Sequence, residues 1–258
     1  MEWLWILIAF PALMAVIIWL IPSDVLKGRL VYVGAAGMMA LTIFLLGSWS
    51  GQEMETAYLY VNTAFWDKAM LAGEVFFMGL IIYESIRHKK YPVMLLSIAQ
   101  TGLMVWLEST VHLPELPHLM VDRLAILMCV IVAFVGGLIC IYAVGYMEAY
   151  HQHHKEFQNR RGFFFAMIFF FLAAMMGLVL SLNMIWMYFF WEVTSVISFL
   201  LIGYTRTEEA VDNSFRALWM NLLGGLGFAA AIVISALKGG TAQLQEVVLA
   251  GSALPLLC

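Results

Sequence analysis

Long apolar runs separated by short polar connections make up most of the chain. About 20 apolar residues in an α-helix cross the roughly 30 Å of hydrocarbon in a membrane. Eight runs reach this length, and they lie at about 3–21, 30–48, 69–86, 92–108, 121–147, 163–182, 184–204 and 215–237. A last apolar run, 247–258, is too short to cross. The pattern predicts an all-α polytopic membrane protein with eight transmembrane helices and a truncated ninth.

The composition supports a membrane protein. The 258 residues are 64% hydrophobic and 12% charged, whereas soluble domains are about half apolar and a quarter charged. A net charge of −4, without a basic run, excludes nucleic acid as a partner. Cys129, Cys140 and Cys258 lie in apolar runs without metal-binding spacing. We therefore predict no metal and no cofactor, and assign any redox chemistry to another chain.

Lysine and arginine fall unequally on the two sides of the predicted helices. If the N-terminus lies outside, ten of the thirteen basic residues lie in inner loops. Lysine and arginine are enriched in the inner loops of membrane proteins, so this orientation is favoured. The inner residues are Lys27, Arg29, Arg87, Lys89, Lys90, Lys155, Arg160, Arg161, Arg206 and Arg216, and the outer ones are Lys68, Arg123 and Lys238. The sequence therefore predicts an outside N-terminus.

Two outer connections are longer than the other loops. Residues 49–67 contain a β-prone run, AYLYV, at 57–61. Residues 109–120 carry two prolines and two histidines, and suit a surface hairpin or a short interfacial segment.

Glu192 is the first candidate for function, because an ionisable side chain in hydrocarbon is costly and is commonly functional. It is the ninth residue of the run 184–204, which places it about 12 Å below the outer end. Helical spacing puts Tyr188 and Ser195 on the same face. Burial favours the neutral acid, which can gain or lose a proton in a relay. The alternative is a structural glutamate that hydrogen-bonds two helices.

Glu74 and Gln100 form a second polar pair in the predicted membrane. The runs 69–86 and 92–108 are joined by a short turn, so they should pack antiparallel with these two residues at similar depth. We expect a mutual hydrogen bond with a structural role, and participation of Glu74 in a relay stays open.

Two polar residues mark the run 215–237. Asn221 precedes three glycines at 224, 225 and 227, a composition that favours close helix packing, although the amide could also line a wet cavity. Arg216 lies at the inner mouth of this helix, where it either extends to the surface or faces a carboxylate.

Five of the six histidines lie in two loops, at 109–120 and at 148–162. His151, His153 and His154 lie close enough in sequence to bind a metal. Because no carboxylate or cysteine completes an ordered site in this solvated inner loop, we do not predict one. His112 and His118 lie outside, where a surface role is expected.

Several motifs from Val121 onward resemble the antiporter-like ion-pumping subunits of respiratory complex I, energy-converting [NiFe] hydrogenases and Mrp-type cation/proton antiporters. They are VDR at the start of a helix, the SLN turn at 181–183, and Trp-Glu at 191–192 in a helix that ends LLIGY. The resemblance covers about 118–237. It implies a prokaryotic inner-membrane location, the start of an inverted-repeat fold, and a proton-relay role for Glu192.

The chain departs from this family in several ways. The lysine partner of the family's glutamate lies on a following helix, in a K-x-A-Q-x-P-like stretch, whereas this chain ends at PLLC. Some members carry Arg and Asp where Leu222 and Gly225 align. The pair of helices at 69–108 is additional, and resembles hydrogenase versions. We therefore divide the chain into N-terminal helices with an outer hairpin loop, 1–120, and an incomplete first repeat, 121–258.

Three functions remain open. The first is a non-catalytic, proton- or sodium-translocating subunit of a redox-driven complex, with other membrane subunits and the lipid bilayer as partners. The second is an Mrp-type cation/proton antiporter subunit. The third is a truncated membrane scaffold without transport. In the first two, a further chain is expected to supply the C-terminal half.

Overall fold

The computed structural model describes residues 4–50, 56–59, 63–110, 119–239 and 242–249. Helices are present at all eight predicted runs. They are α1 (Trp5–Leu20), α2 (Asp24–Ser50), α3 (Thr63–Arg87), α4 (Tyr91–Thr110), α5 (Arg123–His153), α6 (Arg161–Leu180), α7 (Met184–Ile202) and α8 (Glu208–Gly239). A short helix, α9 (Leu244–Leu249), follows, and two strands are β1 (Ala57–Leu59) and β2 (Leu119–Val121).

The number of membrane crossings is only partly confirmed. Among the described helices, the seven from α2 to α8 are long and apolar enough to cross a membrane. Helix α1 has 16 residues and is therefore about 24 Å long, short of the roughly 30 Å of a hydrocarbon core. The crossing by α1 and the outside N-terminus stay predictions. Most of the predicted ninth helix, residues 250–258, lies outside the described residues.

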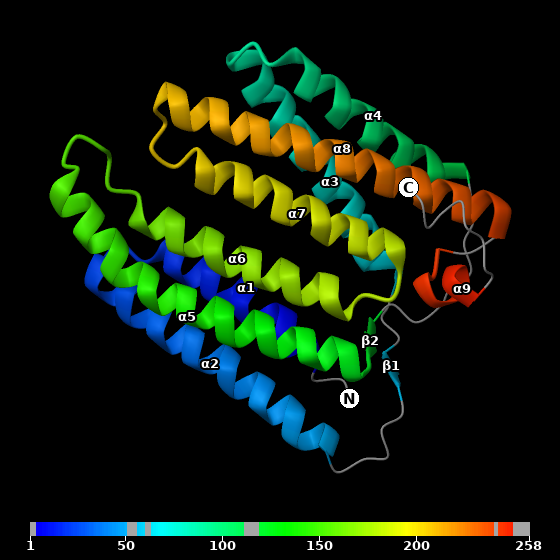
Figure 1. Cartoon of the computed structure of the whole chain (residues 1–258), viewed down its shortest axis with the longest axis horizontal. Helices are drawn as coiled ribbons and strands as arrows, with labels where there is room; N and C mark the ends of the chain where they lie inside the picture. The colour runs from blue at the N-terminus through cyan, green and yellow to red at the C-terminus, as the bar shows by residue number, and fades with distance from the viewer. Residues whose placement is uncertain (1–3, 51–55, 60–62, 111–118, 240–241, 250–258) are drawn as a thin grey trace.

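Consecutive long helices run in opposite directions, so their connections gather at two ends of the molecule (Figure 1). One end holds β1, β2, α9 and the first turns of α3, α5 and α7, and is called the strand end. The other holds the first turns of α2, α4, α6 and α8, and is called the basic end. The predicted outer and inner loops therefore lie at opposite ends.

The strand end is built from segments that are distant in the sequence. Strands β1 and β2 are antiparallel, with Ala57 opposite Val121 and Leu59 opposite Leu119. Leu119 also bridges to Ser181, in the turn before α7. The β-prone run therefore does form a strand at 57–59, whereas its partner was not predicted. Most of the predicted 109–120 hairpin lies outside the described residues.

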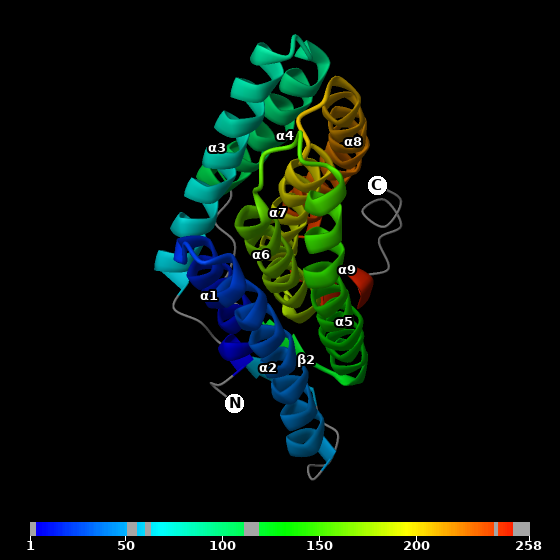
Figure 2. The same ribbon diagram turned by 90° about the vertical axis from the view of Figure 1, so that its left-hand side faces the viewer.

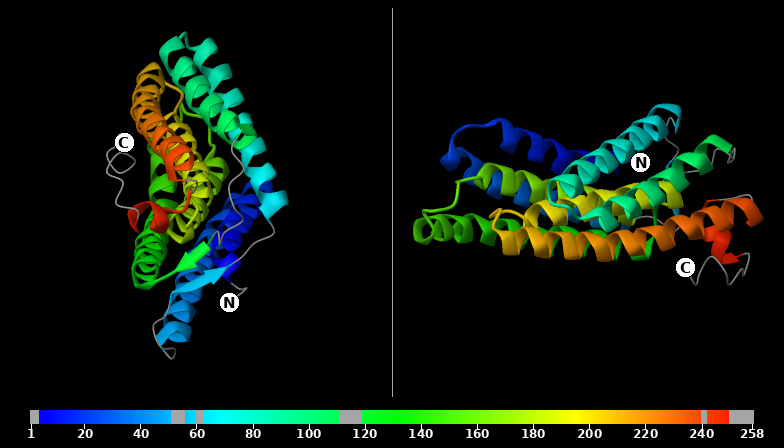
Figure 3. Two further views of the ribbon diagram at one scale, coloured as in Figure 1. Left: turned by 90° about the vertical axis from the view of Figure 1, so that its right-hand side faces the viewer. Right: turned by 90° about the horizontal axis from the view of Figure 1, so that it is seen from above.

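The long helices pack as two groups. Helices α1, α2, α5 and α6 contact one another, and α3 and α4 pack with α7 and α8, while α6 and α7 join the groups. Figures 2 and 3 show α3 and α4 as a hairpin beside α7 and α8. Apolar side chains fill this second group, including Ile81, Val93, Val196, Phe199, Phe215 and Leu218. The additional helix pair therefore covers the helix that carries Glu192.

One face of α5 is apolar and exposed, as expected for a helix that contacts lipid. Its exposed side chains recur every three or four residues, which is the helical period. They are Leu124, Leu127, Ile131, Val135, Leu138 and Tyr142. In a bilayer this stripe needs no protein partner.

Polar contacts fasten the connections at the basic end. Asp24 accepts hydrogen bonds from Lys27 at 3.1 Å, Arg161 at 3.0 Å and Asn159 at 2.9 Å. Lys90, in the turn before α4, pairs with Asp212 of α8 at 2.8 Å. These pairs join the first turns of α2 and α6, and attach the α3–α4 hairpin to α8.

Candidate functional site

Helix α7 carries the central carboxylate. The helix begins after Asn183, whose side chain caps it by accepting from the backbone N–H of Ile185 at 2.9 Å. Tyr188, Glu192 and Ser195 are all buried on one face of the helix. This arrangement agrees with the predicted face, because residues three and four apart lie on the same side of a helix.

Glu192 is 6% exposed and accepts two hydrogen bonds on one oxygen. The Tyr188 hydroxyl, one turn earlier on α7, donates to Oε1 at 2.8 Å. The Nε2 amide of Gln100, on α4, donates to the same atom. Among the described residues no ion pair involves Glu192. The carboxylate is therefore held by two neutral donors from two helices.

The contact of Gln100 differs from the one that the sequence predicted. Gln100 and Glu74 are both buried, at 2% and 1% exposed. The amide nevertheless donates to Glu192, and both carboxylate oxygens of Glu74 are buried without a hydrogen-bond partner within the described part of the chain. The predicted Glu74–Gln100 bond is wrong, because α4 presents this face to α7 and α8.

The buried face of α4 carries further polar groups. Ser97, Gln100 and Thr101 lie within one helical turn, and all are at most 2% exposed. With Glu192 they line a small cavity. The centre of a water molecule can occupy about 10 Å³ inside it, which is room for about one water. Ser97 Oγ and Gln100 Oε1 are buried without a partner in the described residues. The cavity thus offers free polar groups to one water.

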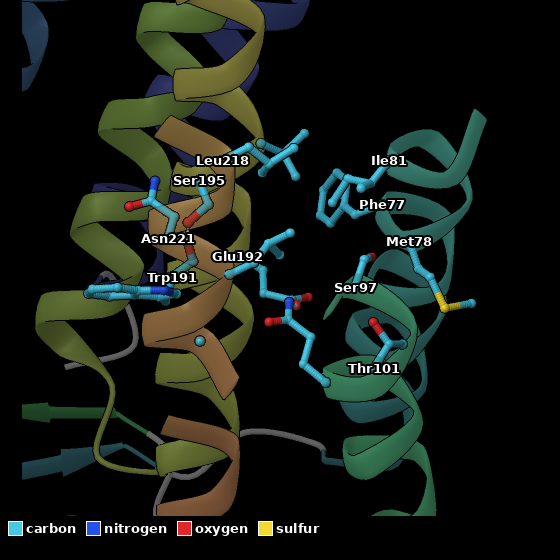
Figure 4. A pocket seen from close by; sticks show the side chains of 14 residues that line it. Phe77, Met78, Ile81, Ser97, Thr101, Trp191, Glu192, Ser195, Leu218 and Asn221 are labelled. Atoms are coloured by element: carbon cyan, nitrogen blue, oxygen red, sulfur yellow. Dashed lines mark hydrogen bonds between the residues drawn. The ribbon is translucent and has the colours of Figure 1, made fainter. Parts of the chain in front are cut away.

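The other predicted lining residues lie at different distances from this carboxylate. Ser195 lines the cavity, but its hydroxyl donates to the Trp191 carbonyl at 3.1 Å. In Figure 4, Glu192 extends toward α4, whereas Asn221 and Trp191 lie on the other side of it. Asn221 nevertheless contributes to the cavity lining from α8.

Arg216 lies away from the central site. It is exposed near the basic end of α8, where its charge acts on Asp212 one turn earlier. Arg216 therefore extends to the surface, which is the first predicted alternative. The carboxylate near it there is Asp212, and Arg216 does not contact Glu192.

Two glycines allow the helices to approach at this level. A Cβ atom on Gly225 of α8 would lie 2.9 Å from Gln100 Oε1, and one on Gly73 of α3 would lie 2.8 Å from the Phe189 ring. Since both distances are shorter than normal contacts, a larger residue would displace these side chains. The glycines therefore bring α4 to α8, and α3 to α7, at the depth of Glu192.

A second contact between α3 and α7 was not anticipated from the sequence. The indole N–H of Trp186 donates to Asp67 Oδ1 at 2.8 Å. Trp186 is completely buried, so its N–H needs a partner. A buried tryptophan signals such a need, but the sequence does not reveal which element supplies the acceptor.

The histidines make different contacts. His151 Nε2 pairs with the Tyr204 hydroxyl at 2.8 Å, and His154 with Glu156 at 3.1 Å. Within the described ranges, no group of three His, Cys, Asp or Glu side chains could hold a metal. His112 and His118 lie outside the described residues.

Two family models match the chain. The first describes the N-terminus of chain 5 of NADH-ubiquinone oxidoreductase (complex I) and matches residues 106–158. The second describes the transmembrane part of NADH:quinone oxidoreductase and Mrp antiporters, and matches residues 181–255. The second match includes Tyr188, Glu192 and Asn221, whereas Glu74 and Gln100 precede both matches.

Curated relatives agree with these models. The chain is 32% identical over 161 residues to Na(+)/H(+) antiporter subunit A1 of Staphylococcus haemolyticus (strain JCSC1435), which covers 61% of this chain and 19% of the relative. It is 34% identical over 132 residues to subunit A1 of Staphylococcus saprophyticus, which covers 51% of this chain and 15% of that relative. The matched part thus spans less than a fifth of these relatives.

The apolar helices and the bacterial relatives together indicate a multi-pass prokaryotic membrane protein. The two family models and the curated relatives agree with the Trp-Glu helix: the matched parts of the chain are similar to the antiporter-like membrane subunits that complex I and the Mrp antiporters share.

Proposed function

We propose that the chain forms part of a cation/proton-translocating membrane subunit, in which Glu192 is the proton-relay carboxylate. The observation that carries this proposal is a buried acid held in place by Tyr188 and Gln100, next to a cavity for about one water. A carboxylate buried among helices is commonly functional, since its charge is costly there.

The chemistry is proton binding and release at Glu192. In the ionised state, the Tyr188 hydroxyl and the Gln100 amide stabilise negative charge on Oε1. In the protonated state, Oε1 still accepts from both donors while the other oxygen carries the proton. The side chain therefore keeps its position as the proton arrives or leaves, and a water in the cavity passes the proton on.

Two assemblies could use such a subunit. A redox-driven complex of the complex I or energy-converting hydrogenase kind is supported by the complex I family model. A gradient-driven Mrp-type antiporter is favoured by the relatives, which are named Na(+)/H(+) antiporter subunit A1. In both, other membrane subunits are the expected partners.

Replacement of Glu192 by Gln tests the proposal, because Gln keeps the shape of the side chain but cannot carry the proton. In inverted membrane vesicles that hold the assembled complex, we expect proton transport, followed with a pH-sensitive dye, to fall by about a hundredfold. Glu84→Gln is the matched control, since Glu84 pairs with His88 near the basic end of α3. Unchanged transport in Glu192→Gln would favour the membrane scaffold instead.

The same vesicles distinguish the two assemblies. An Mrp-type antiporter exchanges Na⁺ for protons without an electron donor, so a Na⁺ pulse should collapse a proton gradient made by respiration. A redox-driven complex should move protons only when its electron donor and acceptor are supplied. The response that Glu192→Gln abolishes identifies the driving reaction.

A further inference from the structure

The register of α3 against α7 places a second carboxylate at the same depth as Glu192. Both helices begin at the strand end and run in the same direction (Figure 1). The hydrogen bond from Trp186 to Asp67 fixes their relative position near that end. At 1.5 Å per residue, Glu74 is about 10 Å deeper than Asp67 and Glu192 about 9 Å deeper than Trp186. Glu74 and Glu192 therefore lie at the same depth.

Helix α4 runs in the opposite direction and carries polar residues at the same two depths, which we call levels. Gln100 contacts Glu192, and Glu108 lies eight residues further along α4, about 12 Å closer to the strand end. Glu108 lies within electrostatic range of Asp67. One level therefore holds Asp67 and Glu108, and the deeper level holds Glu74 and Glu192.

Side-chain packing confirms that α3 and α7 meet at the deeper level. Phe189 of α7 lies against Gly73 of α3, and its ring centroid is 6.3 Å from that of Phe77. Glu74 lies between these two contacts in the sequence of α3. It lies within electrostatic range of Glu192 and of Glu108. The two helices thus bring Glu74 and Glu192 within electrostatic reach.

Glu74 has no structural role that the described contacts reveal. It is 1% exposed, and neither of its oxygens accepts or donates a hydrogen bond within the described residues. No ion pair in that part of the chain involves it. Gln100 Oε1 and Ser97 Oγ, which line the cavity at Glu192, are also buried without a hydrogen-bond partner in the described residues. Buried polar groups are normally satisfied, so the unsatisfied oxygens of Glu74 point to a mobile ligand such as water or a proton.

We propose that Glu74 is a second proton-carrying carboxylate, and that the α3–α4 hairpin forms a proton route between the strand end and Glu192. This inference rests on the proposed relay role of Glu192. Asp67 and Glu108 form the opening of the route, and Glu74 exchanges protons with Glu192 at its inner end. Since α3 and most of α4 precede both matched regions, this route belongs to the additional helix pair.

Each step of the route moves one proton and breaks no other bond. At the inner end, the O–H bond of a protonated Glu74 breaks as a new O–H bond forms on Glu192, directly or through a water that gives up one proton as it accepts another. Glu74 is left ionised and takes up the next proton from the strand end through Glu108. Because an isolated charge here is costly, the pair holds at least one proton between transfers.

The first test uses variants of Glu74 in inverted vesicles that hold the assembled complex. We expect Glu74→Gln to slow proton transport by about tenfold or more, because the amide cannot carry the proton. Glu74→Asp keeps a carboxyl group and should recover part of the rate. Glu84→Gln, on the same helix, should transport protons at the wild-type rate. If both Glu74→Gln and Glu74→Leu transport at the original rate, the route through Glu74 is wrong.

A second measurement separates proton transfer from a structural role. The titratable groups that act on Glu74 are Glu192 and Tyr188 of α7 and Glu108 of α4. Infrared difference spectra between acidic and alkaline conditions should show carboxylic acid bands from the buried acids. Glu74→Gln should remove one band, and Glu192→Gln another. A purely structural Glu74 would leave the bands unchanged, and that result would overturn the inference.

The two proposals can fail separately. If Glu192→Gln abolishes transport while Glu74→Gln changes neither the rate nor the infrared bands, the relay at Glu192 stands and the hairpin route is wrong. If Glu192→Gln transports normally, the proposed function itself is wrong. The amount of each variant in the membrane is measured by immunoblot, so a rate is compared per assembled complex.

Discussion

Gln100 and Glu192 are 92 residues apart in the chain, and the amide of one donates to the carboxylate of the other between α4 and α7. The Gln100 oxygen faces Gly225 of α8 and has no hydrogen-bond partner among the described residues. The Gln100 side chain of α4 thus contacts both α7, which carries Glu192, and α8. One of the two hydrogen bonds to Glu192, that from Gln100, therefore comes from a part of the chain that the family models do not match.

Replacement of Gln100 by Leu should weaken both the helix contact and proton transport. The variant keeps a similar volume but removes the amide donor, so among the described residues Glu192 Oε1 keeps the Tyr188 hydroxyl as its donor. Interhelical hydrogen bonds in membranes contribute roughly 0.6 to 1.7 kcal/mol, so we expect a small decrease in thermal stability in detergent and a larger one in transport rate. Leu95→Met, on the exposed face of α4, serves as control. Transport at the original rate would show that Gln100 has no part in the relay.

The two adjacent glycines of α8 offer a matched pair of variants. A Cβ on Gly225 would meet Gln100 Oε1 at 2.9 Å, whereas one on Gly224 would lie 3.6 Å from Trp191, an ordinary contact. Alanine favours a helix over glycine by about 1 kcal/mol. We therefore expect Gly224→Ala to keep or raise stability with normal transport. Gly225→Ala should displace the flexible Gln100 side chain and reduce transport, at little cost in stability. Equal transport by both variants would contradict this.

Trp186→Phe tests the contact that sets the register of α3 against α7. The variant retains an aromatic ring but loses the N–H that donates to Asp67 at 2.8 Å. Hydrogen bonds to charged groups contribute about 1.5–3 kcal/mol in soluble proteins, so the melting temperature in detergent should fall measurably. Trp66→Phe is the control, because Trp66 is exposed and stacks on Trp5. A fall of the same size in both variants would assign the effect to packing.

Stability at alkaline pH should depend on Tyr204, in the connection after α7. Its hydroxyl pairs with His151 at 2.8 Å and accepts from the backbone N–H of Arg160 at 3.2 Å. Burial raises the pKa of Tyr204 above its ordinary value of 10.0, although Arg160 opposes this. Above pH 10 the unfolded chain therefore loses this proton first, and the folded state loses stability as the pH rises.

Unfolding by heat at several pH values checks this prediction. Tyr204→Phe should be less stable than the wild-type protein at neutral pH, because both contacts of the hydroxyl are lost. The difference in stability between the two proteins should shrink above pH 10. Tyr83→Phe, an exposed position on α3, should keep the original pH dependence. A difference that is constant across the alkaline range would show that the Tyr204 hydroxyl does not titrate with unfolding.

The sequence alone determined the class of protein, the positions of the long helices and the neighbours of Glu192 on its own helix. These properties are local. Apolar length decides whether a segment can form a membrane helix, and the 3.6-residue period decides that Tyr188 and Glu192 share a face. The Tyr188 hydrogen bond could therefore be anticipated from spacing, as could the β-prone character of residues 57–59.

Only the tertiary structure decided which helix supplies the second donor. Two polar residues at equal depth on antiparallel helices, Glu74 and Gln100, are expected to bond to each other. Yet a helix has several faces, and its sequence does not state which one meets which neighbour. Gly225 and Gly73 let α4 and α3 approach α8 and α7 closely, which turns Gln100 toward Glu192 and leaves the oxygens of Glu74 without a hydrogen bond among the described residues. Contacts between distant segments follow from the packing of all helices together, because each buried face must find a complementary one.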